Sequence, residues 1–137
     1  MRGRGGIDGM RQEAGPVRSL LGKGWAETDP EAANPKLRGR TYGIPFDTVW
    51  RCTLELVTER GRWTIMRNDD EAGIIEVIVE TFVFRFVDDV RISITLDENG
   101  QTRVDVASSS RKGRVDFGTN RRRIGRFLRD LDRRLER

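Results

Sequence analysis

Hydrophobic and polar positions along the chain become periodic from Gly39 onward. Residues 40–44 fit a short strand, and helical spacing of apolar residues follows Pro45. Asp47 stands where an N-cap residue would accept hydrogen bonds from the first free backbone N–H groups of that helix. The apolar face of this expected helix consists of Phe46, Val49, Trp50, Thr53, Leu54 and Val57.

Four further strands are expected after this helix, because short apolar runs alternate with turn residues. The clearest is residues 90–96, in which apolar and polar side chains alternate as in a half-buried strand. The expected strands are Trp63–Met66, Ile74–Phe86, Val90–Leu96 and a last one that contains Val104 and Val106. The turns expected between them are Asn68–Gly73, Asp88–Asp89 and Asp97–Gly100.

The longest expected strand, Ile74–Phe86, changes its apolar side part-way along. The apolar side chains before the change are Ile75, Val77 and Val79, and those after it are Phe82, Phe84 and Phe86. Because the side-chain period of a strand is two residues, an unbroken strand cannot place both sets on one face. The sequence therefore predicts a bulge or a break near Glu80–Phe82.

A basic amphipathic helix is expected over residues 121–137, and it completes the order β-α-β-β-β-β-α. Its apolar stripe consists of Ile124, Phe127, Leu128, Leu131 and Leu135. This order predicts an α+β fold: an antiparallel meander with two helices packed on one face, like helix-grip or TATA-binding-protein-like two-layer folds. Residues 1–38 are rich in Gly and Pro and are expected to form a flexible N-terminal tail, which leaves residues 39–137 as a single domain.

Composition limits the cellular setting and the chemistry of the chain. With 137 residues, one domain is expected, and 35% charged residues are typical of a soluble protein. No run approaches the ~18 apolar residues of a membrane span, and the N-terminus lacks the apolar region of a signal peptide. A single cysteine excludes an intrachain disulfide framework, so we expect a cytoplasmic protein. The absence of histidine excludes Ser-His-Asp, Cys-His and His-based metal sites.

Charge is distributed unevenly along the chain. Residues 41–110 contain 7 basic and 13 acidic side chains, whereas residues 111–137 contain 11 basic and 4 acidic ones. A cationic unit of this kind attracts phosphate groups, nucleic acid or anionic lipid. The alternative is that the acidic and basic parts neutralise each other within the fold.

The loop before the last helix is the candidate binding site, because a flexible glycine lies among cations beside a helix start. The expected ligand-binding residues are Arg111, Lys112, Gly113, Arg114, Asn120 and Arg123. The side chain of Asp116 or Thr119 could instead accept hydrogen bonds from the free backbone N–H groups at the helix start, and an external anion would then not be needed there.

Two adjacent aspartates, Asp88 and Asp89, are the carboxylates whose role is hardest to assign from the pattern. One interpretation is that one of them caps a turn while the other pairs with an arginine of the last loop. In that case they form a structural clamp together with Asp116. The other interpretation makes all three part of the binding site.

Residues 34–137 resemble the bacterial family called domain of unknown function 1499. The resemblance is carried by Phe84-Arg-Phe-Val-Asp-Asp-Val-Arg-Ile92, Thr102-Arg-Val-Asp105, Ser108-x-Ser-Arg-x-Gly-x-x-Asp-x-Gly-x-Asn120, Arg123-Ile124 and Phe127-Leu128. The family supplies no catalytic residues. Its characteristic positions would be Asp88, Asp89, Ser110, Arg111, Gly113, Asp116, Gly118, Asn120 and Arg123.

These observations favour a non-enzymatic binding or accessory domain that needs no cofactor and presents a cationic surface to an anionic small molecule, lipid headgroup or partner. The alternative is a peripheral membrane or lipid-handling module, because helix-grip sheets can enclose apolar ligands and the last helix is cationic. A carboxylate-dependent enzyme and a nucleic-acid binder are weaker alternatives, the latter because no base-stacking platform is evident. A cavity between sheet and helices would favour a ligand there, and a filled core would not.

Overall fold

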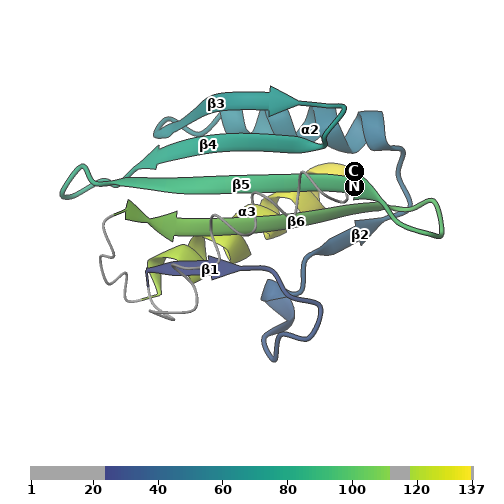
Figure 1. The fold of residues 1–137 in the computed structure, drawn as a ribbon, viewed down its shortest axis with the longest axis horizontal. Helices are drawn as coiled ribbons and strands as arrows, with labels where there is room; N and C mark the ends of the chain where they lie inside the picture. Colours follow the sequence, from purple (N-terminus) through teal and green to yellow (C-terminus); the bar gives the residue numbers. More distant parts are fainter. Residues whose placement is uncertain (1–23, 112–117, 137) are drawn as a thin grey trace.

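A computed structural model describes residues 24–111 and 118–136 of the chain (Figure 1). The elements are β1 (Trp25–Glu27), the 3-10 helix η1 (Pro35–Leu37), β2 (Arg40–Tyr42), α2 (Phe46–Thr58), β3 (Trp63–Asp69), β4 (Ile74–Glu80), β5 (Val87–Leu96), β6 (Thr102–Ser110) and α3 (Thr119–Leu135). They form one antiparallel sheet of six strands with α2 and α3 behind it in the view of Figure 1. The expected α+β class is confirmed.

The sheet has the strand order β1-β6-β5-β4-β3, and β2 also pairs with β6. Strands β3 to β6 pair in succession, so this part of the sheet is the expected meander. Two short strands complete the free edge of β6. Strand β2 pairs with its beginning, at Val104, and β1 pairs with its end, at Ser109.

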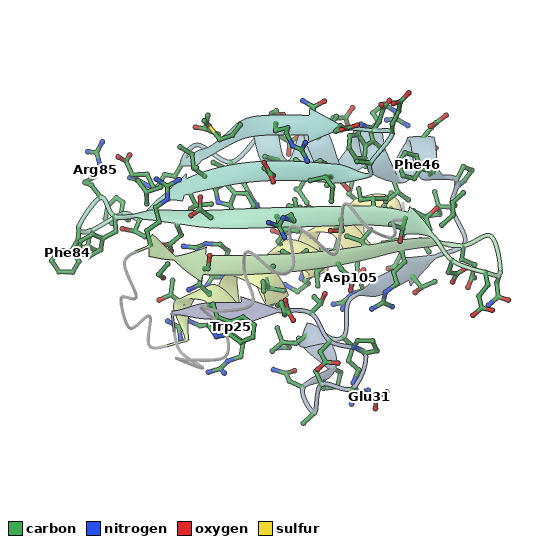
Figure 2. All side chains as sticks on the ribbon, viewed as in Figure 1. Trp25, Glu31, Phe46, Phe84, Arg85 and Asp105 are labelled. Atoms are coloured by element: carbon green, nitrogen blue, oxygen red, sulfur yellow. The ribbon has the colours of Figure 1, made fainter. Side chains whose placement is uncertain are left out.

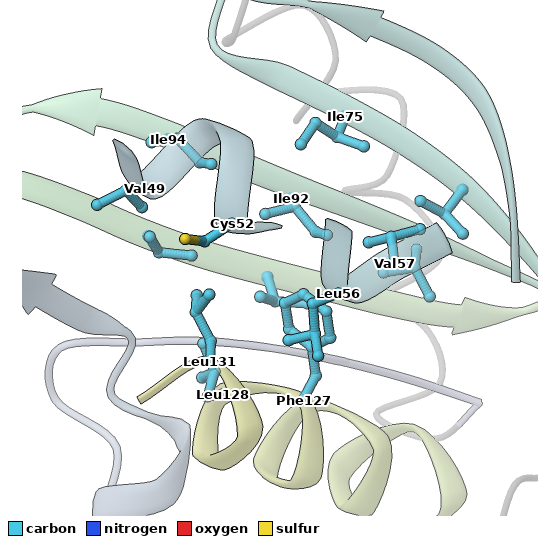
Figure 3. Packing of buried hydrophobic residues seen from close by; sticks show 14 of the residues in the cluster. Val49, Cys52, Leu56, Val57, Ile75, Ile92, Ile94, Phe127, Leu128 and Leu131 are labelled. Atoms are coloured by element: carbon cyan, nitrogen blue, oxygen red, sulfur yellow. The ribbon is translucent and has the colours of Figure 1, made fainter. Parts of the chain in front are cut away.

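Both helices cover the same face of the sheet, and the apolar core lies between the two layers (Figure 3). Alternation within each strand selects the side chains that enter the core. Strand β5, for example, buries Val90, Ile92 and Ile94, while Arg91 and Ser93 point to the open face. Helix α3 contributes its expected stripe, Ile124, Phe127, Leu128, Leu131 and Leu135, which is buried throughout.

Helix α2 is rotated slightly from its expected orientation. Its buried side chains are Val49, Cys52, Thr53, Leu56 and Val57, whereas Phe46, Trp50 and Leu54 are only partly buried. The helix begins at Phe46 directly after Pro45, so the expectation that Asp47 is the N-cap is wrong. Asp47 still lies in the first turn, where its carboxylate favours the positive end of the helix dipole.

The connection between β4 and β5 corrects the expected strand Ile74–Phe86. The predicted break is present, because β4 ends at Glu80. The phenylalanines beyond it do not continue the strand, and residues 81–86 form the loop of a hairpin. The expected turn at Asp88–Asp89 is also wrong, since both residues lie within β5.

The expected tail of residues 1–38 is corrected for its last part. From Gly24 onward the chain belongs to the fold, with β1 paired to β6 along residues 107–109. The Thr28 hydroxyl donates to Asp105 (2.7 Å), and the Thr28 backbone N–H donates to the Val106 carbonyl (2.8 Å). Residues 1–23 lie outside the described residues.

Candidate anion-binding site

Strand β5 separates the two aspartates of the predicted site. Because successive side chains of a strand point to opposite faces, Asp88 lies on the helix side of the sheet and Asp89 on the open side. Their arginine partners are separated in the same way: Asp88 pairs with Arg123 of α3, and Asp89 pairs with Arg111. The two described pairs, Asp88–Arg123 and Asp89–Arg111, therefore lie on opposite sides of the sheet.

The residues on the helix side form a buried polar network, which we call the polar clamp (Asp88, Ser108, Ser110, Asn120 and Arg123). The Arg123 guanidinium contacts the Asp88 carboxylate (2.9 Å), and the Asp88 side chain is 1% exposed. Arg123 also donates to the Ser108 hydroxyl (3.0 Å) and to the Asn120 side-chain oxygen (2.9 Å).

Asn120 completes the polar clamp. Its oxygen accepts from the Ser108 hydroxyl (2.6 Å), and its NH₂ group donates to the Ser110 hydroxyl (3.0 Å). These contacts join β5, β6 and the first turn of α3. A buried network of hydrogen bonds and an ion pair favours one arrangement of the elements that it connects. Asn120 is fully buried.

On the open side, Arg111 makes a two-bond contact with Asp89, with its Nε at 2.9 Å and its Nη2 at 2.8 Å from the carboxylate oxygens. Both side chains are about half-exposed. The hydrogen bonds to Asp89, and then its charge, raise the pKa of Arg111 above the ordinary value. This geometry agrees with the interpretation in which an arginine of the last loop pairs with one of the aspartates.

Lys112, Gly113, Arg114 and Asp116 lie outside the described residues. Helix α3 follows Gly118, which has a φ of 86° in the left-handed region that glycine adopts most readily. Thr119 is therefore the first helical residue and not the cap.

A cleft beside the start of α3 contains Arg123, which the pattern singled out, together with three arginines that it did not. It has a volume of about 320 Å³ and is lined by Arg60, Trp63, Thr119, Arg122, Arg123, Arg126 and Asp130. We call it the arginine cleft. Among the described residues that line it, four side chains are cationic and one is anionic, which is the electrostatic character of an anion site.

Contacts within the arginine cleft hold two of its cations in place. The Arg60 guanidinium lies 5.2 Å from the centre of the Trp63 ring and contacts Asp130 at 2.8 Å. Arg123 is held by the polar clamp. Arg122 and Arg126 are exposed and lie one turn apart on α3. Their spacing of four residues was a usable signal in the sequence, but the approach of Arg60 and Trp63 from the α2–β3 connection was not.

A larger hollow of about 470 Å³ lies on the open face of the sheet. Its lining includes Trp25 of β1, Met66 of β3 and the oppositely charged pair Glu76 and Arg91. The space between sheet and helices, in contrast, is filled by the apolar core (Figure 3). Neither hollow therefore lies between the sheet and the helices, where the sequence analysis considered an enclosed ligand.

Two further observations concern the described residues, 24–111 and 118–136. They contain no group of His, Cys, Asp and Glu side chains that could hold a metal ion. None of their helices has the length and apolar character that crossing a membrane would require.

The family model described as "Protein of unknown function (DUF1499)" matches residues 24–131, which is most of the chain. The chain belongs to this family. The DUF1499 match begins one residue before β1 and ends within α3, so it includes both the edge strand and the polar clamp. A comparison with curated proteins finds no match.

Proposed function

We propose that this DUF1499 protein is a non-enzymatic binding domain that holds an anionic group, such as a phosphate or carboxylate of a small molecule or a lipid headgroup, in the arginine cleft. The observation that carries the proposal is a hollow of about 320 Å³ on which, among the described residues, four arginines and one carboxylate, Asp130, converge. Guanidinium groups bind carboxylate and phosphate oxygens through paired, charge-assisted hydrogen bonds.

The cleft is partly organised before any ligand arrives. Arg60 is fixed between the Trp63 ring and Asp130, and Arg123 is fixed by Asp88. Ordering these long side chains in advance lowers the entropic cost of binding. Arg122 and Arg126 extend from one face of α3 and would close around the bound group.

The predicted loop site takes a modified form in this proposal. Arg111 is engaged by Asp89 on the opposite side of the sheet, and Asn120 is engaged within the polar clamp. The proposed cationic surface therefore lies on the α2–β3 connection and on α3. Arg123 is the one residue that belongs both to this surface and to the site predicted from the sequence. A lipid enclosed between the layers draws no support from the filled core.

The first prediction tests the cleft with inorganic phosphate and pyrophosphate, titrated into the whole protein at two salt concentrations. We expect the backbone amide signals of Thr119 and Arg126 to shift on binding. The variant Arg122→Gln/Arg126→Gln should bind at least about tenfold more weakly, because a hydrogen bond to a charged group contributes about 1.5–3 kcal/mol. Calorimetry or the shift titration gives the affinity.

A matched control removes the same charge from the same helix outside the cleft. Arg121→Gln/Arg129→Gln should bind as the wild type does, since neither residue lines the hollow or pairs with its carboxylate Asp130. If both double variants lose affinity equally, the effect belongs to the general field of α3 and the cleft is not a site. If phosphate and pyrophosphate leave the signals of Thr119 and Arg126 unmoved, the proposal fails outright.

A further inference from the structure

The loop between β4 and β5 exposes large apolar side chains at one end of the molecule. The exposed fractions are 73% for Phe82, 72% for Val83, 71% for Phe84 and 44% for Phe86. We call these four residues the aromatic tip. Phe84 and its neighbour Arg85 lie at the far end of the sheet in Figure 2, beyond the body of the protein.

The aromatic tip is a closed hairpin loop with its own contacts. The Thr81 backbone N–H donates to the Phe86 carbonyl (2.7 Å), and the Phe86 N–H donates to the Thr81 hydroxyl (2.9 Å). The rings of Phe84 and Phe86 lie 5.5 Å apart. Arg85 has a φ of 60°, a strained left-handed conformation for a residue with a side chain. The backbone thus presents apolar groups outward at a cost in strain.

Cations surround the base of the aromatic tip. The Arg62 guanidinium lies 4.6 Å from the centre of the Phe82 ring, and Arg85 is exposed and pairs with Glu80 (3.1 Å). The strand register brings the arginine cleft to the same end of the sheet, because Trp63 pairs with Val79 and Glu80 pairs with Val87. Four carboxylates at this end each contact an arginine: Glu80, Asp88, Asp89 and Asp130.

We infer that this end of the molecule docks on the surface of a bilayer that contains anionic phospholipid, with the phenylalanines of the aromatic tip inserted at the interface. Exposed apolar side chains at one end of the sheet, with arginines beside them, match a surface that is negatively charged outside and apolar beneath. The docking does not rest on the arginine cleft as a ligand site, because insertion needs only the tip and the nearby positive charge.

A second copy of the chain or a protein groove is a poorer match for the aromatic tip. A stable protein interface buries about 800 Å² on each partner, usually over a broad and complementary patch. Four side chains on a convex hairpin loop are a small surface by that standard. An interfacial anchor, in contrast, needs only a few apolar side chains together with electrostatic attraction.

The second prediction tests the docking by co-sedimentation of the whole protein with vesicles. One vesicle preparation contains phosphatidylcholine alone, and the other contains phosphatidylcholine mixed with phosphatidylserine. We expect binding to the anionic vesicles. The variant Phe82→Ser/Phe84→Ser should bind at least about tenfold more weakly, because it loses the favourable free energy of transferring two phenylalanine side chains from water into the apolar interface. The control Leu96→Ser, at a residue 60% exposed on the opposite hairpin, should bind as the wild type does.

A second readout separates insertion from headgroup contact. An environment-sensitive dye on Phe84→Cys should shift its emission when anionic vesicles are added, whereas the same dye on Leu96→Cys should not. The native Cys52 is buried and should label poorly. Melting temperatures equal to that of the wild type will establish that the variants are folded.

Several results would overturn this inference. One is equal sedimentation of the tip variant and the wild type, and another is failure of the wild type to bind either vesicle. A third is a wild-type dimer in analytical ultracentrifugation that the tip variant dissociates, because the tip would then bind a second copy. The variant Arg122→Gln/Arg126→Gln distinguishes the two proposals: it should lose phosphate binding, whereas at saturating anionic vesicles it should still show the emission shift of the tip, with a vesicle affinity lowered only by the loss of two nearby positive charges.

Discussion

Tyr42 links the edge strand β2 to the end of α3 through a single carboxylate. Its hydroxyl donates to Asp132 (2.6 Å), and the Arg40 guanidinium contacts the other oxygen of the same carboxylate (2.8 Å). Burial, and then the hydrogen bond and charge of Asp132, raise the pKa of Tyr42 far above its ordinary value. The folded protein therefore favours the protonated, neutral form of the Tyr42 side chain.

The third prediction follows from that pKa at the scale of one residue. An unfolded tyrosine loses its proton near pH 10, whereas the folded Tyr42 keeps it, so stability should fall as the pH rises above about 10. Tyr42 is the only tyrosine in the chain, and tyrosinate absorbance should therefore appear only together with alkaline unfolding seen by circular dichroism. Tyrosinate formed near pH 10 in a protein that is still folded would contradict this account.

At the scale of elements, two neighbouring aspartates in β5 have different surroundings and should contribute differently to the free energy of unfolding. Asp88 is buried against Arg123, whereas Asp89 and Arg111 are about half-exposed. Removing one partner of a buried ion pair leaves an uncompensated charge and costs about 3–5 kcal/mol. An exposed pair contributes about 0–1 kcal/mol.

The fourth prediction compares Asp88→Ala with Asp89→Ala in denaturant titrations. Asp88→Ala should lower the free energy of unfolding by about 3 kcal/mol or more, and Asp89→Ala by less than about 1 kcal/mol. The matched pair of substitutions removes the same charge from adjacent positions of one strand. Equal losses would mean that the polar clamp does not hold α3 against β5 as described.

The elements predicted most accurately are those whose periodic apolar residues form one buried face. Strand β5 and helix α3 are examples, since each presents one apolar side to the core. The prediction was wrong where large apolar residues are exposed. Phe82–Phe86 has the composition of a strand, but it forms a loop because the inversion at Glu80 leaves no face for it to bury. Asp88 and Asp89 looked like a turn because aspartate is depleted in strands.

At the scale of the whole molecule, the candidate site depends on contacts between distant parts of the chain. Arg60 and Trp63 meet Arg122 and Arg126 only because α2 and α3 cover the same face of the sheet. Local periodicity carries no information about such pairings, so the pattern located the basic helix but not its partners. Strand β1 was missed for a similar reason: three residues, Trp25–Glu27, are too short for a periodic signal, and β6 alone provides the edge that they need.

The last prediction tests whether the folded unit begins before β1 or after η1. A chain starting at Gly39 should be less stable than one starting at Gly24 by on the order of 3 kcal/mol. The shorter chain loses the β1–β6 ladder and the Thr28–Asp105 contact, and each backbone hydrogen bond contributes about 0.5–1.5 kcal/mol. It should also aggregate more readily, since half of the β6 edge would be unpaired. Denaturant titration and light scattering of both chains measure these effects. Equal stability would restore the boundary at residue 39, because residues 24–38 would then contribute nothing to the fold.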